Sequence, residues 1–208
     1  MAKSAAPAAA TRQRFPASPG AGMGTRVMTG LAPVTALTLA LAGCTTGKPG
    51  TTNRSYSVYA ETKAGFTRSV RANAPRSGRA FGLVEITFHP DYSLATDDKG
   101  CRASVGSVGL ELVILLPKWR DGKPVPGSLK RQWTRFEQTV RNHEMAHIRI
   151  ARAYAARMRK SIAALRSSTG CNQLAGLIKK RIGQIKAQHL RAHERFDLRE
   201  RKRLKRLL

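Results

Sequence analysis

The residues best suited to do chemistry lie between positions 141 and 150, in the stretch RNHEMAHIRI. It contains the pattern H-E-x-x-H, formed by His143, Glu144 and His147. On a helix, residues four apart lie on the same face, so both imidazoles can bind one zinc ion. Glu144 lies on the flank of that face, where its carboxylate can take a proton from a zinc-activated water. The pattern therefore predicts two zinc ligands and the general base of a hydrolase.

The segment that carries this motif should be one long amphipathic helix. Apolar residues recur at spacings of three and four from Trp133 to Leu165, and both histidines fall on that stripe. Ser128 is a suitable N-cap, and residues 167–170 should end the helix. The two imidazoles should therefore face the protein interior, where they need partners. A metal ion is one such partner, and ordinary hydrogen bonds are the alternative.

The rest of the chain predicts an α+β fold. A second helix should begin with Asn172 as its cap and carry an apolar stripe from Leu174 to Phe196. The mixed segment 62–77 has room for a short helix that ends before Pro75. Alternating or apolar runs predict strands at 55–61, 80–92 and 101–119, with a turn at 95–100. We expect a small antiparallel or mixed sheet, followed by two long helices packed antiparallel.

The N-terminus is typical of an export signal. Residues 1–43 contain four basic and no acidic side chains, then an apolar run too short to span a membrane easily. The run ends in Leu41-Ala42-Gly43-Cys44, which resembles the bacterial lipobox, where cleavage precedes a cysteine that becomes lipidated. An ordinary cleaved signal peptide is the alternative. A start at Met23 instead of Met1 would give the basic region a more usual length.

Export bears on the location and on the other two cysteines. We expect the protein on the periplasmic side of the outer membrane if Cys44 is lipidated, and in the periplasm or outside the cell otherwise. In an oxidising compartment, Cys101 and Cys171 should form a disulfide, with two free thiols as the alternative. A loop of about 70 residues closed in this way would stabilise the fold by about 4 kcal/mol.

The formal net charge of the 208 residues is +26, and almost all of it lies outside the export signal. Such a charge favours acidic partners. The basic tail at 201–208 is either a solvated charged face or a contact for anionic lipid headgroups and other envelope polyanions. We expect no nucleic-acid partner, because no aromatic-and-basic nucleic-acid module is recognisable and the chain is exported.

The order of these segments resembles a bacterial family of predicted secreted zinc-dependent proteases, catalogued as domain of unknown function nine hundred and twenty-two. The resemblance rests on five features: GRAFGLVEITFHPDY, the cysteine-led strand that ends in LPKW, Trp133 and Phe136 before HEMAH, the later cysteine, and Phe196-Asp197. It implies a zincin-like metallopeptidase domain with zinc as its cofactor. The chain then divides into a signal peptide (1–43), a flexible tether (44–54), this domain (55–200) and the basic tail (201–208).

The third zinc ligand is the point at which this chain departs from the family. The family closes with Y-D-x-x-T-x-H-G, whose histidine is the expected ligand, but this chain reads FDLRERKR and has Lys202 at that position. His193 is our predicted third ligand, with His189 and Glu200 as alternatives; the two histidines lie four apart on the inward stripe of the second helix. Asp197 would instead orient a ligand through a hydrogen bond.

Two functions remain open. The first is a zinc metallopeptidase of the cell envelope, held to the membrane by lipid at Cys44 and acting on peptides or proteins. Glu144 favours it, because a fold without catalysis has no need of a carboxylate there. The second is a catalytically degenerate lipoprotein of the same fold that serves as a binding or structural module. The missing closing histidine favours this one.

Overall fold

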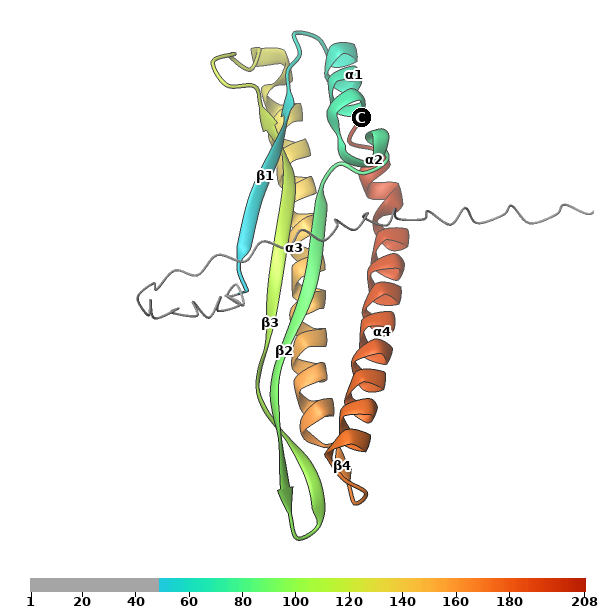
Figure 1. Cartoon of the computed structure of the whole chain (residues 1–208). Helices are drawn as coiled ribbons and strands as arrows, with labels where there is room; N and C mark the ends of the chain where they lie inside the picture. The colour runs from blue at the N-terminus through green and yellow to red at the C-terminus, as the bar shows by residue number, and fades with distance from the viewer. Residues whose placement is uncertain (1–48) are drawn as a thin grey trace, which may run out of the picture. The chain divides into compact units, whose positions relative to one another are not determined.

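The computed structural model describes residues 49–208 (Figure 1). The predicted signal peptide, Cys44 and the tether up to residue 48 lie outside the described residues. Residues 51–54 of the predicted tether belong to a strand, which begins four residues before its predicted start and ends at Val58. The described part contains, in order, β1 (Thr51–Val58), α1 (Lys63–Asn73), α2 (Pro75–Gly78), β2 (Leu83–Asp97), β3 (Gly100–Trp119), α3 (Gly127–Ala163), β4 (Arg166–Ser167) and α4 (Cys171–Lys205). Within these residues, no helix is both long and apolar enough to cross a membrane. The predicted α+β fold class is confirmed.

The sheet is mixed, with strand order β1-β3-β2. β1 runs parallel to β3, whereas β2 runs antiparallel to it along the full length of β2, with a register shift between Asp91 and Tyr92. β3 lies in the centre, as expected for a strand whose second half, from Leu110 to Leu116, is almost continuously apolar. The hairpin turn is tighter than predicted, because Asp97 already pairs with Gly100 and only two residues connect the strands. β2 therefore extends to Asp97, five residues beyond its predicted end.

The two long helices lie side by side and run in opposite directions (Figure 1). Neither predicted N-cap is correct. α3 begins at Gly127, after Pro126, whose carbonyl oxygen accepts the N–H groups of Leu129 and Lys130. Proline is well suited to this position because its fixed φ lets the helix follow directly and its missing N–H is not needed. α4 begins one residue before Asn172, after Gly170, whose φ of 114° favours glycine.

The apolar residues form two main clusters, one toward each end of α3. The first joins α3 and α4 to the sheet and contains Met158, Ile162 and Ile178. The second lies around Phe66 of α1 and Phe136 of α3. His143 and His147 fall between them on α3, after Val140 of the second cluster and before Ala151 of the first. The motif thus lies on a helix that is fixed by packing on both sides.

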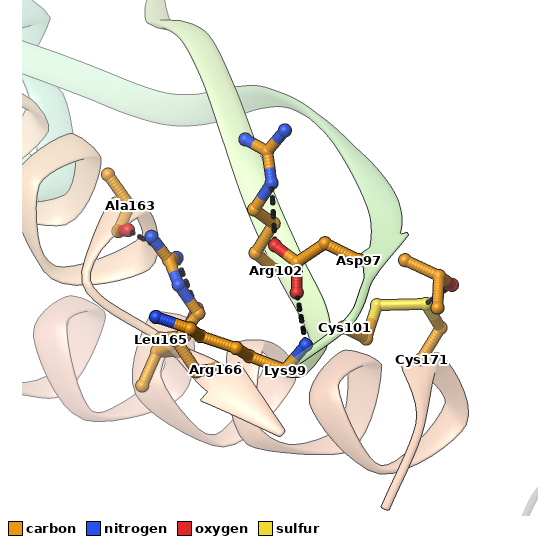
Figure 2. A network of polar contacts seen from close by, with 9 residues as sticks. Asp97, Lys99, Cys101, Arg102, Ala163, Leu165, Arg166 and Cys171 are labelled. Atoms are coloured by element: carbon orange, nitrogen blue, oxygen red, sulfur yellow. Dashed lines mark hydrogen bonds and ion pairs between the residues drawn. A yellow bond between two sulfur atoms is a disulfide. The ribbon is translucent and has the colours of Figure 1, made fainter. Parts of the chain in front are cut away.

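A disulfide between Cys101 and Cys171 joins the start of β3 to the start of α4 (Figure 2). The Cα atoms lie 5.1 Å apart, and the predicted pairing is confirmed. Beside it, residues 166–167 form the short strand β4 on β3, where a simple helix stop was predicted. The same end carries an ion pair between Arg102 and Asp97 (Figure 2). The first turn of α4 is therefore attached covalently to the sheet.

The basic tail is largely part of the folded domain. α4 continues to Lys205, and Leu207 beyond it is only 8% exposed. Leu204, Leu207 and Leu208 pack in the cluster of Phe66, on the side of α1. The Arg and Lys side chains between these leucines are exposed. The apolar residues thus hold the chain end against the domain, while the charges face solvent.

Candidate metal centre

α3 and α4 bring four histidines to one place. His143 and His147 lie one turn apart on α3, and His189 and His193 lie one turn apart on α4. The rings of His147 and His193 have their centroids 4.6 Å apart, and so link the two helices. His89 is not part of this group, because it lies on β2 and pairs with Glu111 at 2.9 Å. The antiparallel pairing of the helices therefore assembles the site.

Three of the polar side chains converge on one point. Nε2 of His143 and Nε2 of His147 lie 3.1 Å apart. Oδ1 of Asp197 lies 3.2 Å from Nε2 of His143 and 2.9 Å from Nε2 of His147. Among the described residues, these three form the group whose ligand atoms could hold a metal ion.

The donor set and its dimensions fit zinc. Two imidazole nitrogens and one carboxylate oxygen are usual zinc ligands, at about 2.0–2.2 Å from the metal. In a tetrahedral site such ligands stand about 3.3 Å from one another, close to the observed separations. Hydrogen bonds alone explain the group less well. If both rings donate to Oδ1 of Asp197, both Nε2 atoms must be protonated, and two N–H groups then face each other across 3.1 Å.

The ligand atoms of His143, His147 and Asp197 form a triangle, and His193, predicted as the third ligand, lies outside this triangle. Its Nδ1 is 2.8 Å from Nδ1 of His147, on the side of that ring away from Asp197. A neutral His147 whose Nε2 binds a metal carries its proton on Nδ1 and can donate it to His193. The structure thus gives His193 and Asp197 positions opposite to those that we predicted. The ligand roles themselves stay predictions.

The two alternative ligands also lie outside the triangle. His189 is buried one turn before His193, and its ring packs edge-on against Phe88 and Tyr154. Glu200 has its Oε2 4.0 Å from Nδ1 of His143 and forms an ion pair with Arg203. It stands on the far side of the His143 ring, whose Nδ1 has no hydrogen-bond partner among the described residues.

Phe196 packs against the face of the His143 imidazole. Its ring stacks on that of His143, with centroids 4.9 Å apart and planes 26° from parallel. The adjacent residue in sequence is Asp197, so the pair Phe196-Asp197 contacts the two-histidine motif through both side chains. The resemblance had singled out this pair without assigning a role to the phenylalanine.

Glu144 is buried beside the triangle, with 4% of its surface exposed. Burial raises the pKa of its carboxyl to about 7, with a further rise from Asp197 and opposing effects from His147 and Arg76. Its carboxylate lies directly against the backbone of Gly82: a Cβ placed there would be 2.6 Å from Oε1. The sequence did not reveal this contact, and the only signal was the position of Gly82 in the segment GRAFGL.

Tyr56 holds the same segment in place. Its hydroxyl donates a hydrogen bond of 2.7 Å to the carbonyl oxygen of Phe81, the residue before Gly82. Burial, and then the charge of Glu144, raise the pKa of Tyr56 well above its usual value. The hydroxyl is thus a neutral donor at all ordinary pH values. The sequence offered no sign of this role.

The protonation states of Asp197 and His193 suit a metal site. Without a metal ion, partial burial alone would raise the pKa of Asp197, but hydrogen bonds from His143 and His147 outweigh it and hold the pKa far below its usual range. A cation bound to those two nitrogens would replace the hydrogen bonds and favour the same anion. Burial, and then the neighbouring imidazoles, lower the pKa of His193 to about 4. Asp197 is therefore an anion and His193 a neutral imidazole near pH 7, as a zinc site and a hydrogen-bond partner of a ligand require.

The group opens into a cleft of about 1330 Å³. β2 and the α2 segment line it on one side, α4 lines it on the other, and His143, Glu144 and His147 of α3 lie between them. A volume of this size can hold a peptide segment rather than only a small ion. The arrangement thus combines a cation site, a buried carboxylate and space for a substrate.

Comparison with known proteins gives one match. The model of a family described as "Bacterial protein of unknown function (DUF922)" matches residues 53–203. No curated protein and no solved structure matches the chain. The matched residues include β2, α3, all but the last two residues of α4, the H-E-x-x-H motif and Asp197, and they cover most of the chain. The chain therefore belongs to the DUF922 family of bacterial proteins of unknown function.

Proposed function

We propose that this protein is a zinc-dependent metallopeptidase of the bacterial cell envelope. One observation carries the proposal: the ligand atoms of His143, His147 and Asp197 converge within 2.9–3.2 Å, at the side of a cleft into which Glu144 also faces. Three protein ligands leave a fourth position open, which distinguishes a catalytic zinc site from a closed structural one.

Zinc bound here would polarise a substrate carbonyl and lower the pKa of a water molecule. Glu144 lies next to the ligand set and takes the proton of the attacking water on its carboxylate. The same carboxyl then gives that proton to the departing amine, so that the peptide bond breaks and Glu144 returns to its anionic form. Its burial keeps bulk water away from this proton, and Gly82 leaves room for its carboxylate.

The other residues of the group orient the ligands. His193 accepts a hydrogen bond from Nδ1 of His147, which leaves the lone pair of Nε2 directed at the metal. Phe196 stacks on His143 and limits its rotation. Each of the two histidine ligands is thus held by a neighbour from α4. Catalytic and metal-binding sites need ligands that are held in this way.

The competing proposal is a degenerate module without turnover. Lys202 favours it, because it stands where the family has the closing histidine. Asp197 offers a different third ligand and weakens that argument. An assay of peptide hydrolysis by the zinc-supplemented protein separates the two, with Glu144→Gln as the inactive reference. Cleavage by the parent and not by the variant supports the peptidase, and intact peptides in both samples support the module.

The envelope location rests on the sequence alone. We propose export by the signal at 1–43 and, after cleavage, a lipid at Cys44 that holds the domain at the membrane. Metabolic labelling with a radioactive fatty acid tests it. The parent should become labelled and Cys44→Ser should not; an unlabelled parent would leave the ordinary signal peptide as the explanation.

A further inference from the structure

Cationic side chains gather at one end of the cleft. Arg76 and Arg79 reach it from α2 and the residue after it, and Arg201 and Lys205 from the last turns of α4. These two segments lie side by side near the C-terminus of the chain (Figure 1). All four side chains are exposed, and none takes part in an ion pair among residues 49–208. Arg76, Arg201 and Lys205 are therefore free to meet a ligand, and Arg79 keeps its terminal N–H groups free while its Nε donates to the carbonyl oxygen of Arg76.

This cationic end adjoins the candidate metal centre. Arg201 follows Asp197 by four residues on α4, and Lys205 follows by eight, so both lie on the helix face that lines the cleft. With a rise of about 1.5 Å per residue, they stand about 6 Å and 12 Å along the helix axis from Asp197. Those separations correspond to roughly two and four residues of an extended peptide.

The backbone at Arg76 and Ser77, two residues that line the cleft, has a rare left-handed conformation. Arg76 and Ser77 have φ angles of 54° and 56°, a left-handed conformation that residues with a side chain rarely adopt. Both residues line the cleft. The turn is closed by Arg79, whose backbone N–H and Nε donate to the carbonyl oxygen of Arg76. Strained backbone of this kind is concentrated at functional sites, where it fixes the position of a side chain.

The acids of the cleft do not neutralise these cations. Its acidic residues are Glu144, Asp197 and Glu194. The first two are engaged in the candidate metal centre, which a zinc ion would make more positive. A hollow lined by unpaired charges of one sign concentrates ligands of the opposite sign.

Resting on the proposed peptidase function, we propose that the cleft selects peptides that carry carboxylates on one side of the scissile bond. The carboxylates lie between Arg76 and Arg79 on one wall and Arg201 and Lys205 on the other. They belong either to Asp or Glu side chains or to the C-terminus of the peptide. In both cases arginine provides paired N–H donors that match a carboxylate.

The test measures binding separately from cleavage. The short peptides share one central sequence and differ in their carboxylates. The first kind has an amidated C-terminus and two Glu residues, placed at the N-terminal end in one version and at the C-terminal end in another. The second kind has Gln in place of Glu and a free C-terminus, and the third has Gln and an amidated C-terminus. Calorimetry with the zinc-supplemented full-length Glu144→Gln protein gives the dissociation constants. We then add Arg76→Gln together with Arg201→Gln. The matched control is Arg68→Gln with Arg199→Gln, two exposed arginines of α1 and α4 that do not line the cleft.

We expect at least one carboxylate peptide to bind about tenfold more tightly than the peptide without carboxylates, since two exposed charge pairs contribute about that much. The cleft pair of substitutions should reduce the difference to about threefold or less, because only Arg79 and Lys205 remain, and the control pair should change it by less than about twofold. The peptide that responds identifies the source of the carboxylate. Circular dichroism, together with the single substitution Arg201→Gln, guards against a folding defect in the double variant.

Three results would overturn the inference: equal binding of all peptides, equal losses in the cleft and control variants, or no binding at millimolar peptide. Equal losses would mean that the general positive field of the protein attracts the peptide. Failure of the peptidase proposal has a different signature, which is selective binding by Glu144→Gln with no cleavage of any peptide by the zinc-supplemented parent.

Discussion

Oδ1 of Asp197 lies 2.9 Å from Nε2 of His147, the nitrogen that the H-E-x-x-H spacing directs at a metal. His193 contacts the same imidazole from its opposite nitrogen, at 2.8 Å. One ring of α3 is thus held between two residues of α4 that are one helical turn apart. The carboxylate has the position of a ligand, and the second imidazole has the position of its support. The following predictions depend on this assignment.

Glu144→Gln should retain zinc and lose peptide hydrolysis by at least about two orders of magnitude, because an amide cannot accept the proton of the attacking water. Zinc content by elemental analysis and cleavage of a quenched fluorescent peptide check both parts. Loss of zinc in this variant would make Glu144 a ligand and would contradict the mechanism.

Gly82→Ala should reduce hydrolysis at least about tenfold while zinc content stays unchanged, because misplacing a catalytic group by about 1 Å has effects of this size or larger. The new Cβ would lie 2.6 Å from Oε1 and 2.7 Å from Cγ of Glu144, so the carboxylate must move.

Gly183→Ala is the matched control, since nothing lies within 4 Å of a Cβ at that position on α4. It should keep full activity and stabilise the helix by about 0.5–1 kcal/mol. Full activity in Gly82→Ala would mean that Glu144 does not need its observed position.

Loss of the Cys101–Cys171 disulfide should lower the free energy of unfolding by about 4 kcal/mol, because the bond closes a loop of 70 residues. Urea unfolding of the double serine variant, compared with the oxidised parent, measures the difference. A loss below about 1 kcal/mol would show that the packing of α4 on the sheet needs no covalent attachment.

Leu207→Ala should destabilise the domain by about 2 kcal/mol, because the side chain is buried in the cluster of Phe66. Leu198→Ala, at a leucine of α4 that is 58% exposed, should change the stability by less than about 0.5 kcal/mol. Equal stabilities of both variants and the parent would mean that the chain end does not pack against α1.

The fold was predictable for those helices and strands whose own hydrophobic pattern shows which residues are buried. The stripe from Trp133 to Leu165 predicts which face of α3 is buried, and Phe136, Val140, Met158 and Ile162 are indeed buried. The long apolar run of β3 predicts its central place in the sheet. The predicted cap residues were wrong because both helices begin earlier in the chain than predicted. Pro126 and Gly170 precede the first helical residues, so Ser128 and Asn172 already lie inside the helices.

The composition of the candidate metal centre was less predictable, for a physical reason. His189, His193, Asp197 and Glu200 all lie within three turns of α4, and helical periodicity places several of them toward α3. Which of these side chains contacts His143 and His147 depends on the axial register of the two helices. That register is set by contacts far from the site, including the disulfide at Cys171 and the leucines near position 207. The contact between Gly82 and Glu144 likewise joins a loop to a helix and has no local signature.

The metal content of three proteins tests the central claim most directly. The parent, Asp197→Asn and His193→Gln would be purified without chelator, supplied with zinc, and assayed for zinc per chain. We predict about one zinc in the parent, none in Asp197→Asn, and one in His193→Gln with an affinity lowered about 10- to 100-fold. Zinc kept by Asp197→Asn and lost from His193→Gln would contradict the assignment of the third ligand. A parent that binds no zinc would refute the metal centre itself and leave the degenerate module as the better account.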